Sequence, residues 1–378
     1  MQKMTLSCTC LAVCVLLVSI VGCSTKEKDT LPSNSSTNPE SPSPASETPI
    51  ATTSTDPLVS DDPVQVQPVS IVSPQITLSD TNHLKNPNAT KEAKILYNYI
   101  RDIYGDYIIS GQQESTWKGT PDFEINYIKD NTGRLPAIRG LDYINEDFSG
   151  VTQRAIAWWE LGGIVSICWH WGTPPDGVGY ESSKGKIDLE EALTEGSDLY
   201  NGMIAQMDRV AEELKVLQEA GVPVLWRPFH EFDGAWFWWG KGGGENFKKL
   251  WRLMYDRYTN VHGLNNLIWV LGYSGEVKDG WYPGDEYVDI AGADNYSEGT
   301  QLSKYDKVAA IVGTEMPIAY HENGPIPNPD DMIKDGAKWS WFLTWHTMHI
   351  MEQNTAEYLN TVFNHDYVLT LDELPKFK

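Results

Sequence analysis

The chain has 378 residues, enough for one large domain or two ordinary ones, and its hydrophobic content of 41% supports a substantial core. The net charge of −23 excludes most nucleic-acid-binding functions, because contact with phosphates needs clustered Lys and Arg. An acidic surface instead favours solubility and suits an uncharged partner, and the 15 Trp and 18 Tyr make the chain rich in aromatic side chains.

The first 22 residues have the features of an export signal. Lys3 supplies a thin positive region, and the apolar run Leu11–Val21 is too short to span a bilayer. The segment ends Ile-Val-Gly-Cys at 20–23, which resembles a bacterial lipobox. The resemblance implies cleavage before Cys23 and acylation of Cys23, so that lipid alone attaches the exported protein to the bacterial membrane or cell surface. An ordinary signal peptide with an incidental cysteine is the alternative.

The segment after the signal is predicted to be an extended tether. Residues 24–72 are dense in Ser, Thr, Pro and Asp, so they cannot bury enough apolar surface to offset the entropy of ordering. We therefore expect a signal peptide over 1–22, a lipidated linker over 23–75 and one folded domain over 76–378. Cys168 is alone in that domain, which excludes an intramolecular disulfide there, and we expect it to be buried as a small apolar residue.

From about residue 76 onward, short apolar runs alternate with amphipathic stretches. Helical spacing of apolar residues covers 198–220, 247–258 and 355–363, and the first two stretches end near glycines. Several apolar runs are nearly continuous, as in parallel strands that are buried on both faces. Eight runs qualify as strands: 107–112, 135–143, 163–171, 222–231, 266–273, 288–296, 317–324 and 339–346.

Eight strands that alternate with helices over about 300 residues predict a single α/β domain with the fold of a (β/α)8 TIM barrel. A doubly wound open sheet is the alternative. It would need a glycine-rich phosphate loop after its first strand, and Ser-Gly-Gln-Gln at 110–113 is not such a loop.

A TIM barrel carries its chemistry at the C-terminal ends of its strands. Polar and aromatic residues gather at the ends of these eight runs, which random placement would hardly produce. They are Gln112, Gln113, Asp142, Tyr143, His170, Trp171, His230, Glu231, Asp294, Tyr296, Glu322, Trp345 and His346. We therefore expect the active site among them.

Two of these residues, Glu231 and Glu322, suit hydrolysis of a glycosidic bond. That reaction needs one carboxyl group to protonate the leaving oxygen and another to attack or to activate water. The ends of strands four and seven face each other across a barrel mouth. Apolar surroundings that include Trp236 predict a raised pKa for Glu231, whereas hydrogen bonds from Arg227 or Tyr296 would keep Glu322 ionised. A structural ion pair is the alternative for either glutamate.

Other polar groups fit catalysis less well. Asp142 and Asp294 are better suited to bind substrate or to support other side chains. A zinc protease helix would need histidine where Gly234 stands, and His346 with His349 lacks further metal ligands. We therefore expect neither a metal site nor a cofactor.

The segment Arg-Pro-Phe-His-Glu-x-x-Gly-x-Trp-Phe-Trp-Trp-Gly at 227–240 resembles the acid/base signature of glycoside hydrolase family 26. That family belongs to a clan of (β/α)8 retaining glycosidases with catalytic glutamates on strands four and seven. Most of the clan places Asn before the acid/base, whereas family 26 has His, as this chain does at His230. Trp-Tyr-Pro-Gly at 281–284 and Asp-Asn-Tyr at 294–296 also resemble the family.

Carried over residue by residue, the resemblance implies that Glu231 is the acid/base and that Glu322, in His-Glu-Asn-Gly at 321–324, is the nucleophile. The family often has an apolar residue at the position of Asn323, a mild departure. Trp238 and Trp239 have two possible roles: they contact the sugar, or they fill the space between the barrel and the helices. The candidate substrate-binding residues are His170, Arg227, His230, Trp236, Tyr296 and Trp345.

These features predict a monomeric, retaining endo-β-1,4-mannanase that cuts mannan, glucomannan or galactomannan without a cofactor. The same family includes enzymes that act on mixed-linkage β-1,3-1,4-glucan or on β-1,3-xylan, and loop residues decide among these substrates. A tethered carbohydrate-binding protein without catalysis is the alternative from another class, and its mark would be a substituted Glu231 or Glu322. Endo versus exo action and the tolerated side-chain decorations stay open.

Overall fold

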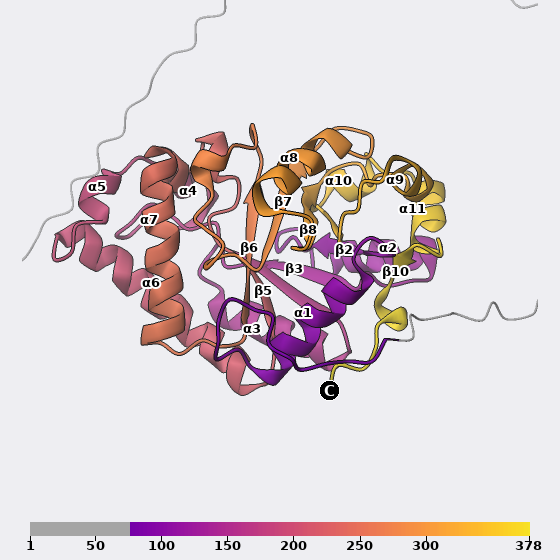
Figure 1. The fold of residues 1–378 in the computed structure, drawn as a ribbon, viewed down its shortest axis with the longest axis horizontal. Helices are drawn as coiled ribbons and strands as arrows, with labels where there is room; N and C mark the ends of the chain where they lie inside the picture. The colour runs from indigo at the N-terminus through magenta and orange to yellow at the C-terminus, as the bar shows by residue number, and fades with distance from the viewer. Residues whose placement is uncertain (1–75) are drawn as a thin grey trace, which may run out of the picture. The chain divides into compact units, whose positions relative to one another are not determined.

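The structure, a computed structural model, describes residues 76–378, and the predicted signal, Cys23 and the predicted linker lie outside this part of the chain. Eight parallel strands close into a barrel in chain order (Figure 1). This arrangement confirms the predicted (β/α)8 barrel and excludes the open sheet. The strands are β2 (Gly111–Gln113), β3 (Ile138–Asp142), β4 (Ile164–Cys168), β5 (Val224–Arg227), β6 (Leu267–Tyr273), β7 (Ile290–Asn295), β8 (Ile318–Asn323) and β9 (Phe342–Thr344).

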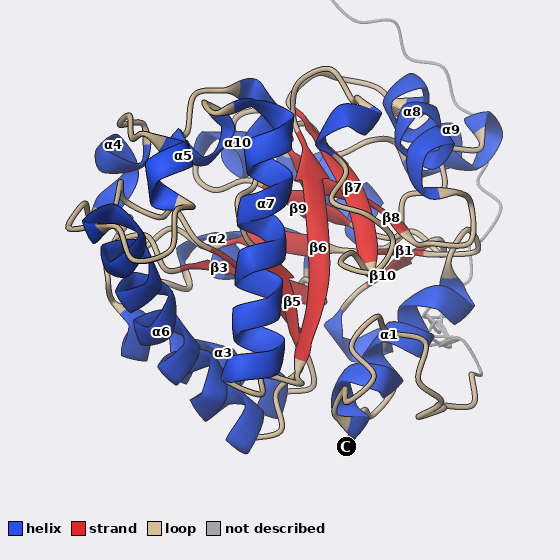
Figure 2. Ribbon diagram, turned by 60° about the vertical axis from the view of Figure 1, so that its left-hand side comes forward, coloured by secondary structure: helices blue, strands red, loops and turns tan. Residues whose placement is uncertain are grey.

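Helices surround the barrel (Figure 2). The three predicted helical stretches correspond to α6 (Asp198–Glu219), α7 (Gly243–Asp256) and α11 (Ala356–Phe363). No helix within residues 76–378 combines the length and the apolar character needed to cross a membrane. The other helices are α1 (Lys91–Ile103), α2 (Phe123–Thr132), α3 (Phe148–Glu160), α4 (Gly179–Ser183), α5 (Leu189–Ala192), α8 (Leu302–Val312), α9 (Pro329–Asp335) and α10 (Met348–Met351).

The first predicted strand is divided into two short strands. Ile108–Ile109 forms β1, which pairs with β10 (Val368–Leu369) outside the barrel, and β2 begins at Gly111. A side chain at Gly111 would come within 2.7 Å of the Phe342 carbonyl oxygen. The glycine therefore lets β2 approach β9 closely enough to close the barrel.

The pairing of β7 with β8 contains a register shift that changes the direction of the side chains at the end of β8. Ala293 pairs with Tyr320, but Asp294 pairs with Glu322, so His321 is an extra residue in β8. Such bulges are frequent beside active sites, because they redirect a side chain. The ring of His321 fits because its neighbour on β6 is Gly272, where a Cβ atom would lie 2.4 Å from that ring.

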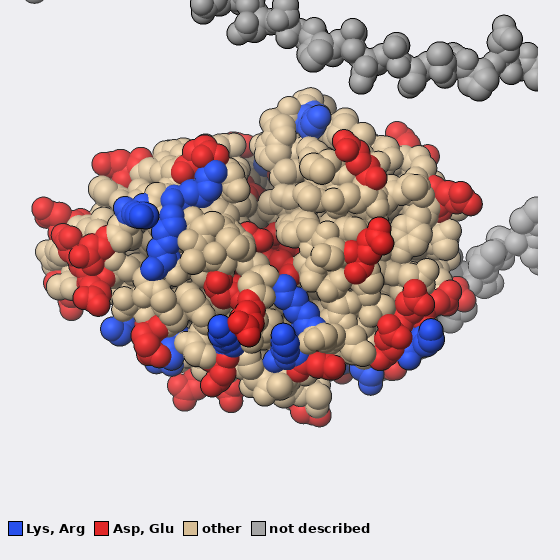
Figure 3. Space-filling view, turned by 90° about the horizontal axis from the view of Figure 1, so that it is seen from above, with Lys and Arg blue, Asp and Glu red and all other residues tan. Residues whose placement is uncertain are grey.

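The C-terminal ends of the barrel strands meet on one side of the domain, marked by the arrowheads of β6 and β7 at the top of Figure 2. Figure 3 looks onto this side and shows a hollow near the middle of the surface, with acidic side chains inside it. The predicted active-site residues follow or end these strands.

Candidate active site

Glu231 lies in the turn directly after β5, the fourth strand of the barrel. Pro228 ends β5, because proline has no N–H group for the strand ladder. Phe229 and Glu231 then adopt positive φ angles of 53° and 55°, which are uncommon for residues other than glycine and often mark functional turns. This turn places the Glu231 carboxyl beside Trp236, whose Nε1 donates a hydrogen bond to Oε2 at 2.8 Å.

The surroundings of Glu231 favour its protonated form. Burial raises the pKa of Glu231 to about 8, and the nearby carboxyl groups of Asp294 and Glu322 add to the increase. The hydrogen bond from Trp236 works in the opposite direction, because it stabilises the carboxylate. The predicted increase in this pKa is therefore confirmed, and Glu231 can hold a proton at neutral pH.

Glu322 is the next-to-last residue of β8, the seventh strand of the barrel, and is 1% exposed. Its Oε1 accepts a hydrogen bond from Arg227 at 2.9 Å, and its Oε2 accepts one from the Tyr296 hydroxyl at 3.0 Å. Burial, and after it the nearby Asp294, raise the pKa of Glu322 above its ordinary value, and the Arg227 guanidinium opposes this increase. The two donors match the sequence prediction and favour the ionised carboxylate.

Arg227 has no exposed surface, so it supports the site from below rather than reaching a ligand. Besides Glu322, it donates to the His321 carbonyl at 3.2 Å and to Gln113 Oε1 at 3.2 Å. Gly140 makes room for Gln113, because a Cβ atom there would lie 2.3 Å from that oxygen. This placement corrects the expectation that Arg227 binds substrate and makes it the group that orients Glu322.

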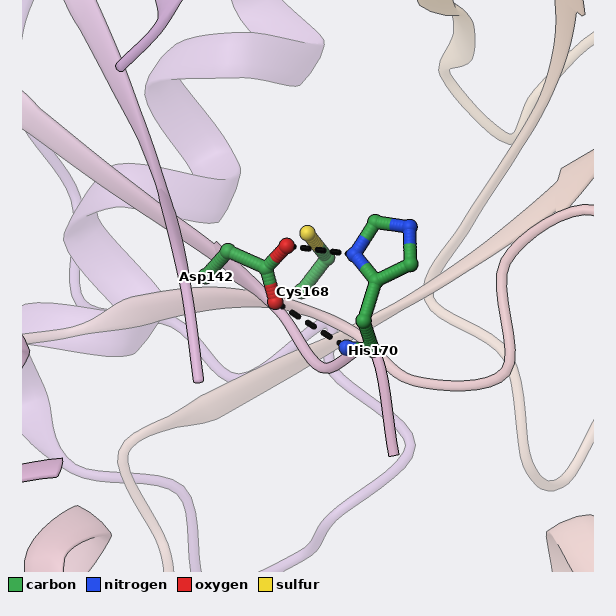
Figure 4. A group of neighbouring side chains, drawn as sticks. All are labelled: Asp142, Cys168 and His170. Carbon is green, nitrogen blue, oxygen red and sulfur yellow. Dashed lines mark hydrogen bonds and ion pairs between the residues drawn. The ribbon is translucent and has the colours of Figure 1, made fainter. Parts of the chain in front are cut away.

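Two histidines from neighbouring strand ends form a buried pair. Asp142 bonds the backbone N–H and the Nδ1 atom of His170, as Figure 4 shows, and His170 Nε2 lies 3.1 Å from His230 Nε2. Burial opposes the charged ring of His170, but Asp142 outweighs it and raises the His170 pKa. Burial and the adjacent His170 lower the pKa of His230 well below its usual value. We therefore infer that His170 donates and that neutral His230 accepts.

The tryptophans that follow the acid/base motif have different surroundings. Trp236 is 40% exposed and can contact a ligand. Trp238 and Trp239 are buried, and their indole N–H groups donate to the carbonyls of Trp171 and His230. These two residues therefore hold the loop against the barrel, which decides between the two interpretations of their role.

Trp345 follows β9 and lies beside His170, with ring centroids 6.0 Å apart. Both residues line a cavity of about 460 Å³, a size typical of ligand pockets. His346, Trp117 and Tyr180 line the same cavity. Of the six predicted substrate-binding residues, the structure thus brings His170 and Trp345 together in this cavity, whereas His230, Trp236 and Tyr296 lie outside its lining.

Two side-chain clusters place metal-ligand atoms within 4.8 Å of one another among residues 76–378. One consists of Asp142, Cys168 and His170, and the other of Asp294, His321 and Glu322. Aspartate and histidine bond each other directly in both clusters, and burial raises the pKa of the Cys168 thiol, which disfavours a metal-binding thiolate. Both clusters are therefore better described as hydrogen-bonded supports. As predicted, Cys168 is buried in its strand.

Several contacts could not be found from the sequence pattern. The N–H donor that Trp236 supplies to Glu231 depends on the turn between them, and the contact of Gln113 with Arg227 depends on closure of the barrel. The role of the buried Glu124 could not be predicted either, because it lies in helix α2 and not at the end of a predicted strand. The only signal for Asp142 was its place at the end of a strand.

Residues 85–373 match the model of Glycosyl hydrolase family 26. A mannan endo-1,4-beta-mannosidase of Thermothelomyces thermophilus is 39% identical over 313 residues, which cover 77% of this chain and 63% of that protein. Mannan endo-1,4-beta-mannosidase B of a Piromyces species is 37% identical over 313 residues, covering 78% and 54%. The chain thus spans less than two thirds of the length of these relatives.

The crystal structure of a Podospora anserina GH26-CBM35 β-(1,4)-mannanase has the same fold as this domain. The TM-score is 0.72 at 38% sequence identity, and the match covers 81% of this chain and 72% of that one.

Proposed function

The chain belongs to glycosyl hydrolase family 26, and on that premise we propose that it is a retaining endo-β-1,4-mannanase. Glu322 is the nucleophile in this proposal, and Glu231 is the acid/base. The observation that carries it is the contrast in what surrounds the two carboxyl groups: Glu322 accepts hydrogen bonds from a guanidinium and a phenol, which favour its carboxylate, whereas Glu231 accepts one from a neutral indole and has a pKa raised to about 8. A glycosidase needs this division between an ionised and a protonated carboxyl group.

In the first step, Glu322 attacks the anomeric carbon while Glu231 gives its proton to the leaving oxygen. The guanidinium of Arg227 and the hydroxyl of Tyr296 hold both nucleophile oxygens, which limits the orientations of the carboxylate. Trp236, which is exposed and bonded to Glu231, offers an apolar face to the sugar next to the cleaved bond.

In the second step, Glu231 takes a proton from water, which attacks the glycosyl-enzyme. Once Glu322 is esterified it has no charge, so one of the groups that raises the pKa of Glu231 is lost. The Trp236 N–H still stabilises the Glu231 carboxylate. The same residue can therefore act as an acid in the first step and as a base in the second.

The direct test measures release of reducing sugar from mannan, mixed-linkage glucan and β-1,3-xylan. We expect the wild type to act on mannan and both Glu322→Ala and Glu231→Ala to lose at least about a thousandfold in kcat, as for other essential groups of a catalytic pair. Activity that survives in Glu322→Ala would refute the nucleophile. Release from mixed-linkage glucan but not from mannan would refute the substrate and favour the alternative within the family.

Endo action and retention are tested by products. We expect linear mannan to yield a range of mannooligosaccharides early in the reaction, and the first sugar detected by proton NMR to be the β-anomer. Release of a single short product from the start would indicate exo action. An initial α-anomer would indicate an inverting enzyme.

We also propose that the protein is a monomer that a lipid on Cys23 holds at the bacterial membrane or cell surface. The lipobox-like Ile-Val-Gly-Cys at 20–23 supports this anchor. Cells grown with an alkyne-labelled fatty acid should label the wild-type protein but not Cys23→Ala, which should be released into the medium. Equal labelling of both proteins would exclude this anchor. Light scattering of the detergent-solubilised protein tests the monomer.

A further inference from the structure

The cavity beside the catalytic pair is walled by two loops. Thr116 and Trp117 come from the loop after β2, and Trp345 and His346 come from the loop after β9. Trp117 is 56% exposed, and its ring meets His346 edge-on with centroids 4.5 Å apart. Because this contact joins the two walls, the shape of the cavity depends on how the loops are held relative to each other.

A buried carboxylate connects the two loops. Glu124, in the first turn of α2, has no exposed surface. Its oxygens accept from Ser115 N at 3.1 Å and Ser115 Oγ at 2.7 Å in the first loop, and from Thr347 N at 3.0 Å in the second. All three donors are neutral, and among residues 76–378 no Lys, Arg or His forms an ion pair with Glu124. Burying a carboxylate costs free energy unless hydrogen bonds replace its contacts with water. The three hydrogen bonds to Glu124 are therefore strongly favoured, and they fix both loops to α2.

Thr347 has a backbone conformation that needs this support. Its φ of 52° and ψ of −113° are unusual for a β-branched residue and carry a cost that surrounding contacts must offset. Its N–H points to Glu124, and its hydroxyl lies 3.2 Å from Nδ1 of His346, the residue that meets Trp117. By bonding the Thr347 N–H, Glu124 thus helps to fix the position of His346 in the cavity wall.

A second buried glutamate shows that the base of the first loop is fixed independently. Glu114 accepts from Arg139 at 2.7 Å and from Arg154 at 2.8 Å, which both lie on the barrel side of the loop. Neither arginine belongs to the loop after β9. Glu124, unlike Glu114, therefore bonds both loops and helps to set the position of one against the other.

We propose that Glu124 is a positioning residue for substrate binding: it fixes the walls of the cavity that receives mannosyl units beyond the cleavage point. This inference rests on the proposed mannanase function. Glu231 and Glu322 do not line the cavity, so we expect Glu124 to affect mainly the binding of a long substrate rather than the chemical step.

The experiment compares a long and a short substrate in Glu124→Gln, whose amide N–H₂ cannot accept the bonds that one carboxylate oxygen now accepts. On mannohexaose we expect kcat/KM to fall about tenfold or more, mainly through KM, because charge-assisted hydrogen bonds to both loops are lost. On dinitrophenyl β-mannoside, whose one sugar occupies only the site at the catalytic pair, we expect a change of no more than about twofold. Ser115→Ala removes one of the three bonds and should give a smaller change of the same kind.

The matched control is Asp122→Asn, which removes a negative charge at the start of the same helix. Asp122 pairs with Arg139 at 2.7 Å and makes no contact with the loop after β9, so it should leave both substrates unaffected. A double-mutant cycle with Trp117→Ala should show that the loss caused by Glu124→Gln on mannohexaose shrinks when Trp117 is absent.

Equal losses on both substrates, or no loss on either, would overturn the positioning role. If Glu124→Gln fails to fold, Ser115→Ala decides by the same comparison. The proposed function fails separately, when the wild-type enzyme does not release sugar from mannan.

Discussion

The stability of the protein should increase when Glu231, the proposed acid/base, is replaced by an uncharged residue. Folding raises the pKa of Glu231 from the ordinary 4.5 to about 8, so at neutral pH the native state must hold a proton that the unfolded chain has lost. The variant Glu231→Gln takes up no proton on folding, so it avoids this free-energy cost. The amide oxygen can still accept the Trp236 N–H, so the turn keeps its hydrogen bond.

The size of the effect follows from the two pKa values. A tenfold change in proton affinity is worth about 1.4 kcal/mol, so the difference between 4.5 and about 8 sets an upper limit of about 5 kcal/mol. Because water reaches the partly exposed carboxyl, we expect roughly 1 to 3 kcal/mol. The native state binds the extra proton mainly between these pKa values, so the advantage of Glu231→Gln should be small at pH 4.5, grow as pH rises and level off above pH 8.

Urea unfolding of both proteins at several pH values between 4.5 and 8.5 measures this difference. A variant that is no more stable than the wild type at pH 8, or an advantage that does not depend on pH, would refute the assignment of a raised pKa to Glu231.

The variant Glu322→Gln, in contrast, should be less stable than the wild type. It leaves the buried Arg227 without its carboxylate, which should destabilise the protein by roughly 3 kcal/mol.

Four further changes test the surroundings of the two glutamates. Trp236→Phe removes the N–H that stabilises the Glu231 carboxylate, so the alkaline limb of kcat/KM against pH should move to higher pH. Gly234→Ala places a Cβ atom 2.0 Å from the Trp236 ring, which should displace the indole and lower kcat/KM on mannan. Tyr296→Phe should lower kcat about tenfold or more, because Glu322 loses one of its two donors. Gly272→Ala meets the His321 ring at 2.4 Å and should lower the melting temperature, measured by calorimetry, whereas an unchanged value would contradict the packing argument.

Barrel order and the positions of the two glutamates could be predicted because they follow from short-range patterns. Apolar runs identify strands buried on both faces, and the residue that ends each run lies at the active end of the barrel. The bonds from Arg227 and Tyr296 to Glu322 were also predicted, since strand four faces strand seven across the barrel mouth and strand six lies next to strand seven. Such predictions need only the order of the strands.

Contacts that depend on backbone detail could not be predicted. The extra residue His321 in β8 is visible only once the register of β7 is known, because a shift of one residue reverses which side chains face the barrel. The burial of Arg227, which moves it from ligand contact to support, follows from Gly140 and Gln113 on two other strands. Glu124 joins two loops that are more than 200 residues apart in the chain.

The different surroundings of the two glutamates come from the backbone at the ends of β5 and β8. Pro228 stops β5 early, and the following turn lifts Glu231 away from the strand, where it has one neutral donor and partial contact with water. The bulge at His321 keeps Glu322 within its strand, fully buried between a guanidinium and a phenol. A single proline and one extra residue therefore give the proposed acid/base and the proposed nucleophile different surroundings.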